Sequence, residues 1–283
     1  MTQPLVSIGL PVRNGASQLD NAISSLVQQS YLNIELIISD NFSDDDTQLI
    51  AQKYALRDKR ISYYRQNKLL PVSRNFQFVL AKARGAFFMW AAHDDRRSLD
   101  FVESLLATLL SKPQSILAFG DFFSSSSPAS DGELVPYSFE NSTLSPLQRV
   151  HKACNPMCGH LYGLWKTDLL RLIPIYPCIW AWDQPLMPAA AYLGTFEYTS
   201  GPRLIYYTAP KSHADRALYQ DGRETFNKYS SLLELLYFVF LSSFRVGGLL
   251  PASVALISSL FLHTRNLLRF LLRRLSLTLR SFK

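Results

Sequence analysis

Apolar positions in the first 123 residues follow two patterns in turn, which predict strands and helices. Short apolar runs are typical of buried strands, whereas apolar residues every three or four positions are typical of helices. The expected strands are residues 6–11, 34–39, 61–64, 86–91 and 116–122. The expected helices are residues 19–27, 44–56, 73–84 and 99–110. This alternation predicts an α/β fold with a mostly parallel open sheet and helices on both faces.

The remainder of the chain shows weaker patterns. Here the expected helices are residues 144–152, 167–172 and 182–193, and the expected strands are residues 196–199 and 204–207. A serine-rich loop at residues 124–132 separates the two halves. We therefore expect a first half over residues 1–123, a second half over residues 124–222 and a helical, basic tail over residues 223–283.

Length and composition suit one large α/β domain with an appendage. The chain has 283 residues, of which 48% are hydrophobic, so it can bury a sizeable core. Its 3 cysteines are too few for a disulfide framework and fit a reducing cytosol. The first residues lack the basic start and long apolar run of a secretion signal. We expect a cytoplasmic protein.

Charge is distributed unevenly along the chain. The formal net charge is +7, and residues 235–283 contain no Asp or Glu. That stretch holds all of the excess positive charge, so the body is neutral. This pattern argues against binding of nucleic acid and indicates that the tail has an anionic partner of its own.

The tail carries two apolar patterns. Residues 246–264 are uncharged and approach the length of a membrane span, but they include glycines, a proline and serines. Residues 265–275 alternate leucines and arginines at helical spacing, which is typical of a helix lying on anionic lipid. We expect peripheral attachment to the inner face of the membrane. A membrane span and packing onto the body or a partner subunit are the alternatives.

Acidic residues follow two of the predicted strands. The apolar run 86–91 is followed closely by His93, Asp94 and Asp95, and Asp40 ends the second strand. Ligands of open parallel sheets bind beyond these strand ends. Adjacent carboxylates repel each other, so a bound cation would stabilise them. Caps for the helix that follows are the alternative. No glycine fingerprint follows a strand, which disfavours a nicotinamide oxidoreductase.

Several short segments, in order, carry a resemblance to a known family. They are residues 6–15 (VSIGLPVRNG), 35–45 (ELIISDNFSDD), 74–75 (RN), 83–85 (ARG) and 91–95 (AAHDD). Residues 5 to about 215 resemble the family-two glycosyltransferases of GT-A fold. The resemblance implies an inverting, hexosyltransferase-type enzyme with a UDP or dTDP sugar as donor and a glycan or lipid-linked cell-envelope acceptor. The first half would then bind the nucleotide sugar and the second half the acceptor.

The same resemblance implies a divalent cation at the acidic strand end. Mn²⁺ or Mg²⁺ would neutralise the diphosphate as it leaves. Asp94 is the expected ligand, with His93 and Asp95 assisting. Ala92 stands where the first acid of the family's Asp-x-Asp motif often lies. That departure keeps open a second function, a catalytically silent GT-A-like protein that binds membranes or partner enzymes.

The remaining site residues are also implied by the resemblance. The nucleotide-sugar site would comprise Pro11, Asn14, Asp40, Arg74, Asp94 and Asp95. Asp40 would accept the imide N–H of the base, unless it is a turn residue, and Arg74 would face the nucleotide or cover the sheet.

The segment 180–186 resembles the region that supplies the catalytic base. Asp183 is the candidate base, which would deprotonate the acceptor hydroxyl. Trp180 and Trp182 would stack on sugar rings, and His213 would lie near the diphosphate. The alternative is that Asp183 caps a helix beside core tryptophans.

A cluster in the second half resists this assignment. His151, Cys154, Cys158 and His160 have a spacing that can hold zinc, although Cys-x3-Cys is not a common finger spacing. We interpret them as buried thiols and acceptor-site histidines.

Overall fold

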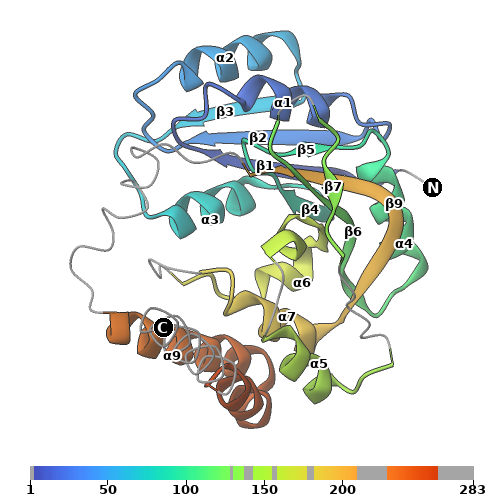
Figure 1. Ribbon diagram of the computed structural model, residues 1–283, viewed down its shortest axis with the longest axis vertical. Coiled ribbons are helices and arrows are strands. Elements are labelled where there is room, and N and C mark those ends of the chain that lie inside the picture. The colour runs from blue at the N-terminus through green and yellow to red at the C-terminus, as the bar shows by residue number, and fades with distance from the viewer. Residues whose placement is uncertain are drawn as a thin grey trace, which may run out of the picture.

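One nine-stranded sheet organises the molecule. The computed structural model describes residues 3–127, 130–136, 143–154, 158–176, 182–208 and 228–260, with residues 158 and 228–235 as backbone only (Figure 1). The strands follow the order β3-β2-β1-β4-β8-β6-β9-β5, and β7 pairs with β6. Their bounds are β1 Val6–Val12, β2 Ile34–Asp40, β3 Ile61–Arg65, β4 Phe87–Trp90, β5 Arg96–Arg97, β6 Ser115–Ser125, β7 Glu133–Leu134, β8 Leu164–Lys166 and β9 Thr195–Tyr207.

The first four strands form the parallel part of the sheet. β1 pairs with β2 and β4, and β2 pairs with β3, all in parallel. Every residue of β1, β2 and β4 is buried, as expected for strands covered on both faces. In Figure 1, α1 and α2 lie on one side of these strands and α3 on the other. The predicted strands and the mostly parallel sheet are confirmed.

The helices begin and end close to the predicted positions. Their bounds are α1 Leu19–Val27, α2 Thr47–Arg57, α3 Val72–Lys82, α4 Phe101–Ser111, α5 Pro146–Ala153, α6 Thr167–Arg171, α7 Leu186–Leu193 and α9 Lys228–Gly247, with a short 3₁₀ helix, η1, at Cys158–Tyr162. α7 starts four residues later than the sequence indicated, because Trp182 to Pro185 form a turn before it.

The second half makes the sheet mixed. β8 lies antiparallel between β4 and β6, whereas β6 and β9 are parallel. β9 is one strand of 13 residues, where the sequence indicated two short pieces. The middle of β9 is irregular: Gly201 has a φ of 110°, and the register with β6 shifts opposite it. This irregularity weakens the alternation of apolar and polar residues by which a strand is predicted from sequence.

The C-terminal helices pack on the second half. α9 lies against α7, and residues 249–260 are also helical and contact α5 through the hydrogen bond between His151 Nδ1 and Ser258 Oγ (Figure 1). Val239, Ala252 and Ala255 are buried in this contact. The opposite side, which we call the apolar face, exposes Tyr237, Phe244, Leu249, Leu250, Ile257 and Leu260. Among the described residues, no helix combines the length and the hydropathy needed to cross a membrane. The leucine and arginine pattern after residue 264 lies outside them.

Candidate active site

Two loops at the carboxyl ends of β1 and β2 are bound to each other. The Asn14 amide donates to Ser43 Oγ at 3.0 Å, and the Asp44 amide donates to Asn14 Oδ1 at 3.1 Å. The Gly15 amide donates to Thr47 Oγ1 at 2.8 Å. Asn14 holds a left-handed backbone with φ of 50°, which Asn tolerates better than most residues. The loops therefore form a fixed platform at the ligand edge.

Pro11 and Arg13 belong to the same platform. Pro11 is buried in β1 opposite Ser39 of β2, so it shapes the backbone that leads into the loop. Arg13 Nε and Nη1 are buried and have no hydrogen-bond partner. Arg13 as a whole is half-buried, and an anionic ligand could accept hydrogen bonds from these two nitrogens. The sequence interpretation gave Arg13 no role, although a charged residue directly after a buried strand was a visible signal.

Asp40 is fully buried and its carboxylate is occupied by protein donors. Oδ1 accepts from the Ser43 amide at 2.8 Å, and Oδ2 accepts from Tyr63 Oη at 2.8 Å and Arg65 Nη1 at 3.1 Å. Burial and the Asp40 carboxylate raise the pKa of Tyr63. The prediction that Asp40 accepts a base N–H does not fit this geometry, because no exposed oxygen remains. The alternative of a turn residue fits.

We expect Asp40→Asn to lower the free energy of unfolding by about 1–3 kcal/mol, since Arg65 loses its buried counter-charge and Tyr63 its charged acceptor. Urea denaturation measures this change. Asp44→Asn, at an exposed position of the same loop, is the control and should be near wild type. A stable Asp40→Asn protein that binds UDP poorly would restore the role in base recognition.

Arg74 lies on the surface at the ligand edge. It occupies the first turn of α3, where its Nη1 donates to Gln77 Oε1 at 2.8 Å. The loop before α3 is fixed to the strand ends, because the Asn41 side chain bonds the Leu70 backbone in both directions, at 2.9 and 2.8 Å. The location permits contact with a nucleotide, which stays a prediction.

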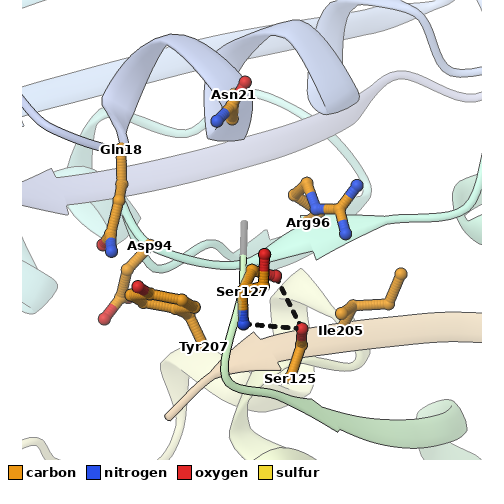
Figure 2. A pocket seen from close by; sticks show the side chains of 8 residues that line it. All are labelled: Gln18, Asn21, Asp94, Arg96, Ser125, Ser127, Ile205 and Tyr207. Carbon is orange, nitrogen blue, oxygen red and sulfur yellow. Dashed lines mark hydrogen bonds between the residues drawn. The ribbon is translucent and has the colours of Figure 1, made fainter. Parts of the chain in front are cut away.

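Asp94 lines a small hollow of about 10 Å³ between the two halves of the chain. The hollow is lined by Gln18, Asn21, Asp94, Arg96, Ser125, Ser127, Ile205 and Tyr207 (Figure 2). It is large enough for about one water molecule or ion. No hydrogen bond or ion pair joins Asp94 to a described residue. Its half-buried carboxylate is therefore available to a ligand.

The two other predicted metal ligands lie elsewhere. A Cβ built on Gly15 would come within 2.6 Å of His93 Cδ2, so the His93 ring packs against that loop. Asp95 is only 5% exposed. Within the described ranges, no three His, Cys, Asp or Glu side chains converge to hold a metal ion. His93, Asp94 and Asp95 therefore do not converge in this structure, and their joint role as metal ligands stays a prediction.

A single carboxylate still fits the expected cation. Mg²⁺ in phosphate-transfer sites is commonly held by one or two carboxylates together with the substrate's phosphates. Asp94 would supply the protein oxygen, and a diphosphate would supply others.

Asp183 lies in the turn before α7. Its carbonyl accepts from the Leu186 amide at 3.1 Å, and burial raises the pKa of its carboxyl group. A raised pKa suits a general base. The adjacent Trp182 packs on Phe76 and on Trp90, the last residue of β4, with ring centroids 4.7 and 6.0 Å away. Asp183 is thus anchored near the end of the strand that leads to Asp94.

The predicted sugar-stacking residues are only partly described. Trp182 is 9% exposed and belongs to the core, so its faces are already packed and the predicted stacking on a sugar does not fit. Trp180 and His213 lie outside the described residues, and their roles stay predictions.

Three of the four candidate zinc side chains are described, and these three separate in the fold. His151 Nδ1 bonds Ser258 Oγ at 2.8 Å, and the His160 ring packs on Phe119 at 4.5 Å with no exposed surface. Cys154 is buried, as expected, and burial raises its pKa to about 11. The interpretation of the histidines as acceptor-site residues does not fit, because one faces the C-terminal helices and the other the core.

The bonded loops and the Asp94 carboxylate, which has no partner among the described residues, lie beyond the carboxyl ends of the strands, where open parallel sheets bind ligands. The model of one sequence family, described as Glycosyl transferase family 2, matches residues 7–152. The chain belongs to this family, and the resemblance seen in its sequence is confirmed.

Similar sequences come from several bacteria. An uncharacterized glycosyltransferase of Rickettsia typhi is 39% identical over 92 residues, which cover 32% of this chain and 28% of that protein. The putative teichuronic acid biosynthesis glycosyltransferase TuaG of Bacillus subtilis is 31% identical over 39% of this chain and 44% of its own length. The GalNAc(5)-diNAcBac-PP-undecaprenol beta-1,3-glucosyltransferase of Campylobacter jejuni is 32% identical over 38% and 34%. The matches span less than half of each relative.

Similar solved structures confirm the GT-A fold. S. aureus TarS 1–349 in complex with UDP-GlcNAc superimposes with a TM-score of 0.68 at 17% identity, covering 90% of this chain and 71% of that one. The mannosyltransferase PcManGT of Pyrobaculum calidifontis, in complex with GDP-Man and Mn²⁺, gives 0.62 at 15% identity, covering 93% and 70%.

Proposed function

We propose that this protein is an inverting, hexosyltransferase-type enzyme that transfers a sugar from a nucleotide donor to a cell-envelope glycan or lipid-linked acceptor. The observation that carries the proposal is the carboxylate of Asp94, which has no partner in the described part of the chain and lies beside the bonded loops of β1 and β2. Family membership supports the transfer of sugar.

Each part of the site would have its own role. The platform of bonded loops would hold the nucleotide, and Arg13 would bind the anionic groups of that nucleotide. Asp94 would hold Mn²⁺ or Mg²⁺, which when bound would neutralise charge on the departing diphosphate. Asp183 would accept the proton of the acceptor hydroxyl, a step that needs one base in an inverting displacement.

The donor and acceptor are proposed by analogy. Because the Asp40 carboxylate is occupied, it gives no argument for a uracil or thymine base. The proposal of a UDP-type donor therefore depends on the similarity to TarS, whose structure was solved with UDP-GlcNAc. PcManGT was solved with GDP-Man, so GDP sugars are the donors to test beside UDP sugars. The names of TuaG and the undecaprenol-linked glucosyltransferase favour an acceptor in the cell envelope.

Nucleotide-sugar binding and turnover test this function. A thermal-shift panel of UDP, dTDP and GDP sugars, followed by release of nucleoside diphosphate in Mn²⁺, should identify one donor that both stabilises the protein and is cleaved. A donor that binds without cleavage, even with acceptor extracts, would favour the catalytically silent GT-A-like protein.

We further propose that the tail binds an anionic membrane at its cytoplasmic surface. The apolar face on α9 and residues 249–260 exposes six large side chains, and the chain after residue 234 has only positive formal charges. Apolar contact and positive charge together are what peripheral helices use on anionic lipid.

We expect removal of residues 265–283 to weaken binding to phosphatidylserine-containing vesicles by more than about tenfold, because each basic residue near such a surface contributes about 1 kcal/mol. Vesicle sedimentation at two salt concentrations measures this, with neutral vesicles as the control. Wild-type binding that is equal on both vesicle types and unaffected by salt would rule out an electrostatic anchor.

A further inference from the structure

The apolar face lies on helices that distribute their residues in reverse. A helix at the surface of a water-soluble body buries its large apolar residues and exposes polar ones. α4 follows this pattern, since its buried residues are Phe101, Val102, Leu105, Leu106 and Leu109. The large side chains of the apolar face are instead 48–66% exposed. An exposed apolar surface of this kind marks a site of contact with a protein or a membrane.

The side of these helices that faces the body carries mostly small residues. Within residues 236–260, Leu236, Val239 and Pro251 are buried, and the other buried residues are all serine or alanine: Ser242, Ser243, Ala252, Ala255, Ser258 and Ser259. Small residues on the inner side let helices approach closely, which is typical of helix contacts inside membranes. Small residues inside and large apolar residues outside form the pattern of a helix that meets lipid.

Polar contacts attach the inner side to the body. His151 Nδ1 bonds Ser258 Oγ at 2.8 Å, and Cys154 Sγ donates to the Ala255 carbonyl at 3.5 Å. At the junction of the two helices, a Cβ built on Gly247 would come within 2.5 Å of the Tyr192 ring of α7. Since the inner side is held against the body, the apolar face is the side that another partner can reach.

The charge of this region complements lipid. Residues 236–260 contain one charged residue, the exposed Arg245, which follows Phe244 of the apolar face. An arginine can lay its apolar stem along such a surface while its guanidinium meets a phosphate group. Acyl chains would then contact the apolar side chains, and lipid phosphates would contact the cation.

We propose that α9 and residues 249–260 form a membrane element whose apolar face lies among lipid acyl chains, so that the protein stays on a membrane even where charge is screened. α7, which begins three residues after Asp183, lies between α9 and the sheet (Figure 1). The candidate base is thus next to a helix fixed to the membrane element. This placement favours a lipid-linked acceptor over a free glycan, a second step that rests on the proposed function.

Flotation of the full chain with neutral phosphatidylcholine vesicles tests the membrane element. In about 1 M NaCl the Debye length is about 3 Å, so charge contributes little. We expect wild type to bind, and Phe244→Ser and Ile257→Ser each to weaken binding by about tenfold, which is what transferring half of a large apolar side chain from water contributes. Leu110→Ser changes an exposed leucine of α4 and should bind as wild type does. Absence of wild-type binding, or an equal loss in Leu110→Ser, would overturn the proposal.

Quenching by brominated acyl chains distinguishes insertion from contact with headgroups. The chain has 4 tryptophans, so the signal is the additional quenching of a tryptophan placed on the apolar face. Phe244→Trp in vesicles of brominated lipid should be quenched more than wild type, whereas Leu110→Trp should show no additional quenching. Equal quenching of the two variants would contradict insertion among acyl chains.

A second copy of this chain is the other occupant that the apolar face could take. Light scattering without lipid should give a molecular mass that Phe244→Ser leaves unchanged. A wild-type dimer that dissociates in Phe244→Ser and does not bind neutral vesicles would assign the face to a protein interface and overturn the proposal.

Transfer assays test the lipid-linked acceptor. With a lipid extract of bacterial membranes in vesicles, Phe244→Ser should transfer about tenfold less sugar than wild type, yet bind UDP in Mn²⁺ equally well, because the nucleotide platform lies in the first half. Equal use by wild type of the extract and of glycans released from it by mild acid would contradict a lipid-linked acceptor. If wild type binds no UDP, the proposed function and this second step fail together, and the vesicle experiments still decide the membrane element.

Discussion

Turnover should fall by about 10²–10⁴-fold when Asp183 is replaced by Asn, which keeps the shape of the side chain and removes the base. The acceptor hydroxyl is a poor nucleophile near neutral pH, so the transition state depends on a group that takes its proton. Donor affinity should change little, because the nucleotide is held by the loops of the first half. Steady-state kinetics with an identified acceptor measure both quantities, and near-normal turnover would assign the base to another residue.

The same variant has an expected effect on stability. Burial raises the pKa of Asp183, so the folded chain binds this proton more tightly than the unfolded chain does. The carboxyl group therefore favours folding below the unfolded pKa of about 3.9, and this contribution is lost as pH rises through the folded pKa. Asp183→Asn removes the charge, so its melting temperature at pH 7 should exceed that of wild type.

Asp94→Asn should abolish the promotion of UDP binding by Mn²⁺. Groups that only orient metal ligands contribute about 10–100-fold in affinity, and a direct ligand should contribute at least as much. Calorimetry in Mn²⁺ and in EDTA measures the difference. Asp94 has no hydrogen bond or ion pair to a described residue, so the variant should keep the wild-type melting temperature.

A matched control for this variant lies on the same segment. Asp100 is an exposed aspartate just before α4, and Asp100→Asn should retain the Mn²⁺ effect. Equal UDP affinity of wild type in Mn²⁺ and EDTA would contradict the metal assignment to Asp94.

The arrangement of the first half could be predicted because its signals are local. Strands such as β1 and β2 are buried on both faces and appear as continuous apolar runs, and α3 and α4 show clear helical spacing. The order of strands and helices then placed Asp94 at the ligand edge by a general rule of parallel sheets.

The role of Asp40 could not be predicted in this way. Its partners Tyr63 and Arg65 come from β3, more than 20 residues along the chain, and meet it only through the register of two strands. A strand-end carboxylate that accepts hydrogen bonds from the protein has the same sequence pattern as one that binds a ligand. The sequence alone does not distinguish the two.

Packing between elements also decides the surroundings of Asp95 and Trp182. Asp95 is only 5% exposed, although both acids of the pair follow the same strand. Trp182 belongs to the core because Phe76 and Trp90 cover its ring. The sequence identified both residues as candidates. Whether each side chain faces the ligand edge or the core depends on packing between elements.

Titration of UDP into the wild-type protein in the presence of Mn²⁺ tests most directly whether this chain is a nucleotide-sugar enzyme. We predict saturable binding at one site per chain that weakens in EDTA and in Asp94→Asn. Absence of binding for UDP, dTDP and GDP alike, in protein shown to be folded, would contradict the proposed function.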